Sequence, residues 1–224
     1  EVTAGTFHAV ANQLLRQRWA DLDRSPPSIL NDRARLIGEL PQVETARSDL
    51  ASIVAAVGVA TARGLTPSTY LHAVRNGALR TTHDPELIAS VLQGYSDLKR
   101  SRRVVDLDDL LALTIDAAER DPTFAEALRW RFRHLLVDEA QDLNPLQHRF
   151  VDLVRSGRDD VFLVGDPAQA IYGFTGSDPS LLVDVADRFP GVEVIRLPVN
   201  HRCTDQVVEL GRVVLGHASI GTPI

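Results

Sequence analysis

The stretch LLVDEAQDLNPLQ, residues 135–147, decides the fold class of this 224-residue chain. Its opening apolar residues run directly into Asp138 and Glu139, a pattern typical of a buried strand that carries carboxylates at its carboxyl end. Pro145 suits the first turn of a helix, which we expect to run to about residue 155. The stretch therefore predicts a strand, an acidic turn and a helix, in that order.

Two later stretches repeat this pattern. Residues 161–166 read VFLVGD and residues 192–197 read VEVIRL, and each predicts another buried strand. We expect helices over residues 180–189 and from residue 204 to about residue 215. Strands that alternate with helices imply βαβ units and a parallel sheet, whose ligands lie outside the carboxyl ends of the strands. The predicted fold class is therefore α/β.

The residues before this region are predicted to be mainly helical. Apolar side chains at helical spacing favour a helix over residues 7–19, with Thr6 as its cap. Residues 28–98 also favour helices, interrupted by prolines and glycines, and contain no recognisable catalytic motif. A further helical run is expected to open at residues 104–111.

The composition is that of an ordinary globular protein. Hydrophobic residues make up 44% and charged residues 24% of the chain. No apolar run approaches the roughly 20 residues of a membrane span, and the N-terminal residues lack the pattern of a signal peptide. The single cysteine, Cys203, excludes an internal disulfide framework, so we expect a cytoplasmic protein that has no membrane partner.

The charge pattern gives little support for nucleic-acid binding. The formal net charge is −6, although a local groove with base stacking can override global charge. Basic clusters at residues 99–103 and 129–134 are expected to be solvated helix ends and linkers. The only lysine of the chain, Lys99, falls in the first of these clusters.

The two acidic residues after the first predicted strand suggest a chemistry. An aspartate such as Asp138 can hold Mg²⁺ near the phosphates of a nucleotide, and an adjacent glutamate such as Glu139 can orient or deprotonate an attacking water. Phosphoryl transfer depends mainly on positioning and charge stabilisation, so these few groups suffice where a phosphate cradle exists. A solvated acidic turn after a strand would give the same local pattern.

Five stretches together carry a resemblance to a known family. They are GTFHA (residues 5–9), DLDDLL (106–111), LLVDEAQDLNPLQ (135–147), VFLVGDPAQAIYGFTGSD (161–178) and LPVNHRCT (197–204). In this order they resemble motif Ib, the acidic segment before motif II, and motifs II, III and IV of the UvrD/Rep/PcrA-type superfamily 1 DNA helicases. The resemblance spans most of the chain.

This resemblance implies a domain organisation. Residues 1–22 and 99–203 would form part of a RecA-like domain (1A), a parallel sheet flanked by helices. Residues 23–98 would form a mainly helical insertion (1B) in that domain. Residues 204–224 would begin the connection to a second RecA-like domain.

The resemblance also assigns roles in ATP hydrolysis. Asp138 and Glu139 would bind Mg²⁺, and Glu139 would activate the hydrolytic water. Gln169 would sense the γ-phosphate, because its amide can both donate and accept. Arg202 would contact the γ-phosphate through its planar cationic fork. Gln141 would organise the nucleotide site, although it could equally cap the turn after the strand.

Four residues are expected to contact single-stranded DNA. Tyr172 and Phe174 would stack on bases, which grips a strand independently of its sequence. Thr6 and His8 would approach the backbone of the strand. Each has a plain structural alternative: core packing for the two aromatic rings, a helix cap for Thr6 and a packed side chain for His8.

Three positions depart from the family pattern. His201, expected to bind the nucleotide, stands where many relatives have a tyrosine associated with adenine stacking, and imidazole offers less stacking area. Phe174 and Thr175 stand where many relatives have tryptophan and arginine, so a DNA or phosphate contact is expected to be weaker here.

One functional element is absent from the sequence. No Gly-x-x-x-x-Gly-Lys-Ser/Thr loop occurs, although that loop builds the phosphate cradle, and Lys99 is expected to lie in a basic linker. The sequence contains no methionine. We therefore expect a fragment that is inactive alone, with motif I before residue 1 and motifs V and VI after residue 224.

The parent protein is expected to be an ATP- and Mg²⁺-dependent DNA helicase that moves 3′ to 5′ along single-stranded DNA in repair or recombination. Single-stranded DNA, 3′-tailed duplexes and repair proteins are the expected partners, and the fragment is expected to be a monomer. Two alternatives stay open. One is a non-hydrolysing DNA- or partner-binding module derived from a helicase, and the other is a subunit of a helicase–nuclease.

Overall fold

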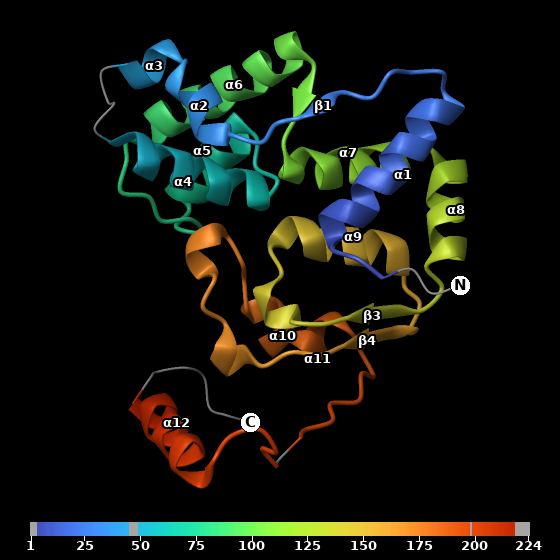
Figure 1. Cartoon of the computed structure of the whole chain (residues 1–224), viewed down its shortest axis with the longest axis vertical. Coiled ribbons are helices and arrows are strands. Elements are labelled where there is room, and N and C mark those ends of the chain that lie inside the picture. The colour runs from blue at the N-terminus through green and yellow to red at the C-terminus, as the bar shows by residue number, and fades with distance from the viewer. Residues whose placement is uncertain (1–3, 45–48, 198, 218–224) are drawn as a thin grey trace.

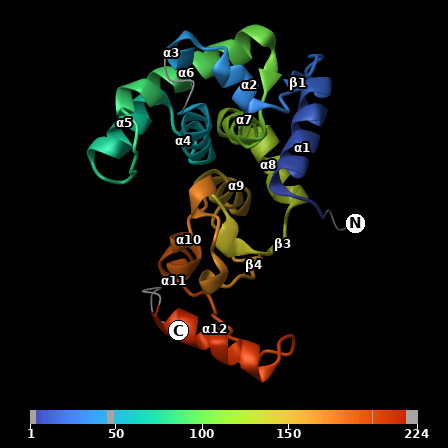
Figure 2. The same cartoon turned by 60° about the vertical axis from the view of Figure 1, so that its left-hand side comes forward.

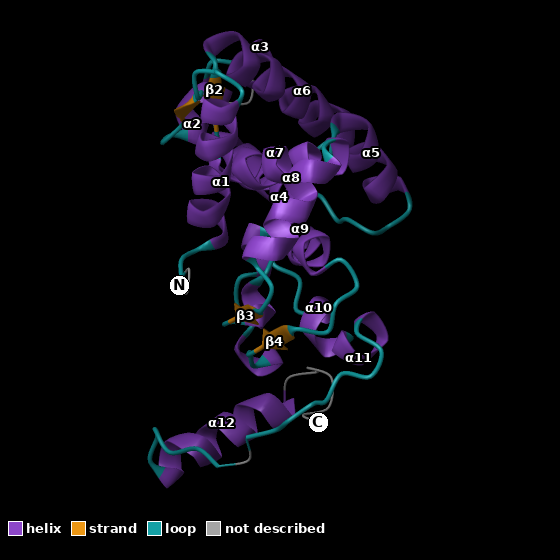
Figure 3. Cartoon of the chain, turned by 90° about the vertical axis from the view of Figure 1, so that its right-hand side faces the viewer, coloured by secondary structure: helices purple, strands orange, loops and turns teal. Residues whose placement is uncertain are grey.

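The computed structural model describes residues 4–44, 49–197 and 199–217 and is dominated by helices (Figures 1 and 3). The α-helices are α1 (Phe7–Asp21), α2 (Arg33–Gly38), α3 (Pro41–Glu44), α4 (Leu50–Ala62), α5 (Pro67–Arg75), α6 (Pro85–Arg102), α7 (Leu107–Arg120), α8 (Pro122–Arg131), α9 (Pro145–Arg155), α10 (Ser180–Val183), α11 (Val185–Arg188) and α12 (Asp205–His217). The short 3₁₀ helices are η2 (Ala140–Asp142), η3 (Pro167–Gln169) and η4 (Gly173–Thr175). The helices predicted at the positions of α1, α9 and α12 are confirmed.

The strands form two parallel pairs. They are β1 (Ser28–Ile29), β2 (Val104–Val105), β3 (Leu135–Val137) and β4 (Val161–Leu163). β3 pairs with β4 from Leu135 opposite Val161 to Val137 opposite Leu163, which confirms the parallel pairing predicted for these two segments. β1 pairs with β2, so the chain enters and leaves the region of α2 to α6 along neighbouring strands.

The helices pack around two larger hydrophobic cores. One core lies among α2 to α6, which we call the helical body, and includes Ile37, Ile53 and Ile88. The other lies among α1, α7, α8 and α9 and includes Leu111 and Phe150. A smaller cluster packs β3 and β4 against α9. We call α1 and α7 to α11 together with β3 and β4 the strand body, and Figure 2 shows α9 between the helical body and β3–β4.

The prediction of a third strand over residues 192–197 is wrong. This segment is extended but pairs with no other strand among the described residues. Its side chains are exposed, and Leu197 is 88% accessible to solvent. A strand needs a neighbouring backbone edge to accept and donate its hydrogen bonds, and in the part of the chain that the structure describes this segment is paired with none.

Two predicted helices differ from the observed ones for local reasons. The single helix predicted over residues 180–189 is two short helices, α10 and α11, that are separated at Asp184. The helical run predicted from residue 104 begins at Leu107, after β2. Asp106 caps it, because its side chain accepts a hydrogen bond from the Asp109 N–H in a capping box.

In the described ranges no single helix is long and apolar enough to cross a membrane. The pair α4 and α5 would meet the criteria of length and composition only if joined, and it is bent by 97°. Residues such as Ile53 and Val57 on α4 are buried in the core of the helical body.

Candidate functional site

Asp138 and Glu139 lie at the carboxyl end of β3, with both side chains exposed. Asp138 accepts a hydrogen bond from the Glu139 N–H through Oδ1 at 3.0 Å. Glu139 has a φ of 53°, in the left-handed region that is costly for a residue with a side chain. The turn therefore exposes two adjacent carboxylates, one of them on a strained backbone.

Gln141 joins this acidic turn to the end of β4. Its side chain is 1% exposed, and its Nε2 donates to Glu139 Oε2 at 2.7 Å. Its Oε1 accepts from the Asp166 N–H at 3.0 Å. The amide uses its donor on one strand end and its acceptor on the other, so it does more than cap the turn after β3.

Asp166 extends this connection to Gln169. Its Oδ2 accepts from Gln169 Nε2 at 2.8 Å, and its Oδ1 accepts from the Ala168 N–H at 2.9 Å. Glu139, Gln141, Asp166 and Gln169 thus form a continuous series of hydrogen bonds across the ends of β3 and β4, which we call the strand-end chain. Asp166 was missing from the predicted site, although an aspartate directly after a predicted strand was a usable signal.

Gly165 allows the two strand ends to approach. A Cβ atom at this position would lie 2.5 Å from Gln141 Oε1 and 2.8 Å from Leu182 Cδ2. Contacts that short do not occur, so a larger residue here would force the Gln141 amide or the Leu182 side chain to shift. The glycine after β4 therefore leaves the space that the Gln141 amide occupies in the strand-end chain.

Tyr172 and Phe174 follow Gln169 on an exposed loop. Tyr172 is 46% and Phe174 is 73% exposed, which contradicts the alternative that they are core residues. Their ring centroids lie 6.2 Å apart with the planes tilted by 45°. We call residues 170–178 the aromatic loop, and it presents two rings to solvent directly after the strand-end chain.

The structure gives Thr6 and His8 structural roles on α1. The Thr6 side chain accepts from the Ala9 N–H at 3.2 Å, which confirms it as the helix cap. His8 is half-buried, and its Nε2 has no hydrogen-bond partner among the described residues. Burial lowers the pKa of His8, while the carboxylates of Asp108 and Asp106 act in the opposite direction. The half-buried position of His8 thus agrees with the packed side chain that was the alternative to a DNA contact.

His201 and Arg202 are exposed and are not joined to the strand-end chain. The Arg202 N–H donates to Asn200 Oδ1 at 2.9 Å, and the neighbouring Cys203 is also exposed. Within the described residues, no hydrogen bond or ion pair links the Arg202 guanidinium to another side chain. Of the predicted site residues, Asp138, Glu139, Gln141 and Gln169 are thus connected by hydrogen bonds, the last of them through Asp166, whereas His201 and Arg202 lie apart from them.

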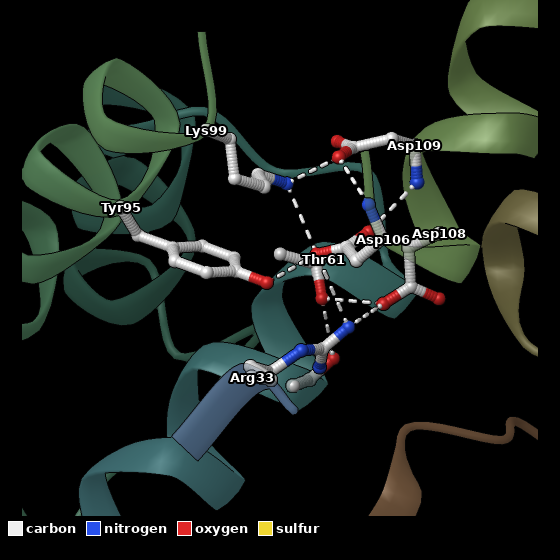
Figure 4. A network of polar contacts seen from close by, with 8 residues as sticks. Arg33, Thr61, Tyr95, Lys99, Asp106, Asp108 and Asp109 are labelled. Atoms are coloured by element: carbon white, nitrogen blue, oxygen red, sulfur yellow. Dashed lines mark hydrogen bonds and ion pairs between the residues drawn. The ribbon is translucent and has the colours of Figure 1, made fainter. Parts of the chain in front are cut away.

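A second polar cluster lies between the helical body and α7 (Figure 4). We call it the junction network, and its members are Arg33, Thr61, Tyr95, Lys99, Asp106, Asp108 and Asp109.

Asp106 lies at the centre of the junction network. Its Oδ2 accepts from Tyr95 Oη at 2.7 Å and from Lys99 Nζ at 3.0 Å. Lys99 also donates to Asp109 at 2.5 Å, and Arg33 donates to Asp108 at 2.6 Å. The charged groups of the two bodies thus satisfy one another.

The prediction that Lys99 lies in a basic linker is wrong. Lys99 is 7% exposed on α6, because the chain turns back through β2 and brings Asp106 and Asp109 against it. The neighbouring cations of residues 99–103 are also paired in part, since Arg100 contacts Asp97 at 2.9 Å and Arg102 contacts Glu39.

The pKa shifts in the junction network follow from burial and pairing. Burial alone would raise the pKa of Asp106, but Lys99 and Arg33 outweigh burial and lower it. Burial and the Asp106 charge raise the pKa of Tyr95 above its usual range, so the phenol remains a donor. The network therefore keeps Asp106 ionised and Tyr95 protonated.

Comparison with known proteins assigns a family. Residues 1–190 match the family model described as the UvrD/REP helicase N-terminal domain. The chain belongs to this family.

Curated relatives cover nearly all of the chain. The "ATP-dependent DNA helicase UvrD2" of Mycobacterium tuberculosis (strain ATCC 25618 / H37Rv) is 34% identical over 224 residues, which cover 97% of this chain and 32% of that protein. The "ATP-dependent DNA helicase PcrA" of Leuconostoc citreum is 28% identical over 231 residues, which cover 100% of this chain and 30% of that protein. The chain thus spans about a third of the length of these relatives.

Proposed function

We propose that this chain is part of an enzyme that couples ATP hydrolysis to movement along single-stranded DNA. The observation that carries the proposal is the strand-end chain, which connects Glu139 to Gln169 through Gln141 and Asp166. The aromatic loop follows Gln169 directly, so a group placed to sense phosphate lies three and five residues from Tyr172 and Phe174. Helicase family membership and the names of the relatives support the same function.

The acidic turn fits Mg²⁺ and ATP. Asp138 is exposed and commits only one carboxylate oxygen to a backbone donor, which leaves the other to hold Mg²⁺. Because Mg²⁺ keeps several water and phosphate ligands, one or two carboxylates suffice. ATP would supply the phosphoryl group, and Mg²⁺ would neutralise the negative charge of its phosphates. Glu139, held at 2.7 Å by Gln141, would accept a proton from the attacking water.

The remaining roles follow the same proposal. Gln169 would sense the γ-phosphate, and Arg202 and His201 would contribute to the nucleotide site. Tyr172 and Phe174 would stack on DNA bases. Thr6 and His8 would lie near the strand backbone.

The two bodies fit the family's domain organisation. We assign residues 1–22 and 99–203 to a partial RecA-like domain 1A, residues 23–98 to the helical insertion 1B, and residues 204–224 to the following connection. The separate cores of the helical body and the strand body support this division. The parallel pairing of β1 with β2 at the entry and exit of the insertion supports it as well.

We further propose 3′-to-5′ movement on single-stranded DNA and 3′-tailed duplexes, and a role with repair proteins in the cytoplasm. These properties rest on the resemblance of motifs Ib to IV. A strand-displacement assay with 3′- and 5′-tailed duplexes tests the direction, since unwinding only of the 5′-tailed substrate would contradict it.

Replacement of Glu139 by glutamine in the full-length protein tests the proposed chemistry. The amide keeps the shape of the side chain but cannot accept a proton, so we expect ATP hydrolysis to fall on the order of 10²–10⁴-fold. Binding of ATP and single-stranded DNA should change little, as measured by equilibrium titration. Glu126→Gln, an exposed change on α8, is the matched control and should hydrolyse ATP normally.

Two outcomes would contradict the proposal. Near-normal ATP turnover in Glu139→Gln would show that Glu139 does not accept the proton of the attacking water. A wild-type full-length protein that binds DNA without hydrolysing ATP would favour a non-hydrolysing binding module.

A further inference from the structure

The C-terminal end of α4 is a rigid turn. The Leu65 N–H donates to the Ala60 carbonyl at 2.9 Å, and the Gly64 N–H donates to the Thr61 carbonyl at 2.8 Å. Gly64 adopts a φ of 65°, as expected of the glycine that ends a helix in this way. We call residues 59–64 the α4 end, and its backbone carbonyls are largely satisfied within the turn.

The α4 end contacts the strand body at three places. A Cβ atom on Gly176 would lie 3.0 Å from Ala62 Cβ, so the aromatic loop is packed closely against α4. The Thr61 hydroxyl donates to Asp108 at 2.6 Å, and a Cβ atom on Gly64 would lie 3.3 Å from Leu146 Cδ1. One turn of the helical body therefore contacts the aromatic loop, α7 and α9.

The aromatic loop is also attached to the strand ends on its other side. The Asp178 N–H donates to the Leu143 carbonyl at 3.0 Å, just after η2. Between these attachments, the Thr175 hydroxyl donates to the Tyr172 carbonyl at 2.7 Å and closes the turn that carries the two rings. The loop thus lies between the strand-end chain and the α4 end.

We infer that the α4 end positions the aromatic loop, so that the helical body sets how strongly DNA stimulates ATP hydrolysis. Gly176 is the positioning residue, because it allows the loop to lie against Ala62. The inference rests on the proposed function and goes beyond it by giving the helical body a part in coupling. Thr61 ties the same turn to the junction network, so a shift of the helical body would move the rings relative to Gln169.

Gly176→Ala in the full-length protein is the principal test. The added methyl group would push the loop from α4, and we expect the DNA-stimulated rate divided by the basal rate to fall about tenfold. The Kd for a single-stranded oligonucleotide, measured by anisotropy, should rise by a similar factor. Basal hydrolysis and the KM for ATP should stay within about twofold, because Glu139 and Gln141 are untouched.

The control must separate contact from backbone strain. Gly157→Ala meets this need, since Gly157 also has a positive φ (81°) but no described residue lies within 4 Å of an added Cβ. It should retain normal DNA stimulation. Equal losses in Gly157→Ala and Gly176→Ala would overturn the inference.

A rescue variant tests the role of α4 directly. Ala62→Gly removes the atom against which the new methyl group would press. In the double variant Ala62→Gly with Gly176→Ala, the DNA-stimulated rate divided by the basal rate should be at least about threefold higher than in Gly176→Ala alone. If the double variant is no better than Gly176→Ala alone, the loop does not depend on α4 and the inference is wrong.

Thr61→Val covers the case in which Gly176→Ala fails to fold. Valine keeps the shape of threonine but loses the bond to Asp108, and we expect DNA stimulation to fall about threefold with unchanged basal hydrolysis. Unchanged stimulation would count against the inference. Failure of the proposed function would look different, because the wild-type protein itself would then show no DNA-stimulated hydrolysis.

Discussion

The junction network and the strand-end chain use similar chemical groups in opposite ways. In the junction network, Asp106 is buried and contacts Lys99, Tyr95 and the Asp109 N–H, so its hydrogen-bonding capacity is used within the protein. In the strand-end chain only Gln141 is buried, while Glu139 and Gln169 are exposed and each makes one side-chain hydrogen bond to the chain.

This difference separates groups that hold the structure from groups that remain available to a ligand. Buried charges that satisfy one another stabilise a fixed arrangement of helices, and the loss of one partner leaves another charge buried and unpaired. Exposed groups that are each held by one side-chain hydrogen bond retain free donors and acceptors. Strong pairing alone is therefore a poor guide to the proposed functional site in this protein.

The largest expected effect of a single change is in the junction network. Asp106→Asn would place an amide among the Tyr95, Lys99 and Arg33 donors while leaving the helix cap possible. We expect the free energy of unfolding to fall by about 3–5 kcal/mol, measured by denaturant titration of the chain.

Asp84→Asn is the matched control, because Asp84 caps α6 from an exposed position. The free energy of unfolding should change by less than about 0.5 kcal/mol in this variant. If the free energy of unfolding falls as little in Asp106→Asn as in Asp84→Asn, the contrast between the junction network and the strand-end chain is wrong.

Gln141→Leu should have an intermediate effect, on catalysis more than on folding. The substitution frees the Glu139 carboxylate and leaves the Asp166 N–H without its acceptor. We expect kcat for ATP hydrolysis by the full-length protein to fall on the order of 10²-fold with little change in KM. Gln147→Leu removes a comparable amide from the capping box of α9 and should leave kcat unchanged. Equal kcat values in the two variants would contradict the positioning role of Gln141.

The smallest effect is a pH dependence from the strand body. Burial, with a further contribution from Arg188, lowers the pKa of His148 to about 4. Its ordinary pKa in the unfolded chain is about 6.5. Between these values the unfolded chain binds more protons, so the free energy of unfolding should fall as the pH falls, by about 1–2 kcal/mol from pH 7 to pH 5.

His148→Gln tests the source of this dependence. The slope of stability against pH should decrease in this variant, although His8 adds a slope of the same sign because its pKa is also lowered. Asp106 should add a separate loss only in more acidic solution, because Lys99 and Arg33 lower its pKa despite its burial. If the free energy of unfolding of His148→Gln depends on pH as steeply as that of the wild type, His148 is not the source of the dependence.

Local signals predicted much of the strand body. The apolar runs at β3 and β4 and the proline of α9 are properties of short stretches, so their elements could be predicted from sequence. The carboxyl ends of parallel strands also predicted where Asp138, Glu139 and Gln169 would lie.

Contacts between distant residues could not be predicted in the same way. Lys99 has the local sequence of a basic linker, and only the return of the chain through β2 brings Asp106 and Asp109 to it. Residues 192–197 have the local pattern of a strand, but a strand also requires a neighbouring edge. The link from Gln141 to Asp166 depends on Gly165, whose need for space appears only when both strand ends are in place.

The left-handed backbone of Glu139 means that thermal stability and the proposed ATP hydrolysis make opposite demands on this position. Glycine adopts this conformation without the cost that a side chain incurs, so Glu139→Gly should relieve the backbone strain while removing both the proposed base and the acceptor of the buried Gln141 Nε2. Selection for thermal tolerance alone would favour glycine where the relief of strain exceeds the cost of the unpaired amide. Sequencing a library of Glu139 variants before and after heat challenge would show whether glycine is enriched there, and a lack of enrichment would mean that the turn is held by other contacts.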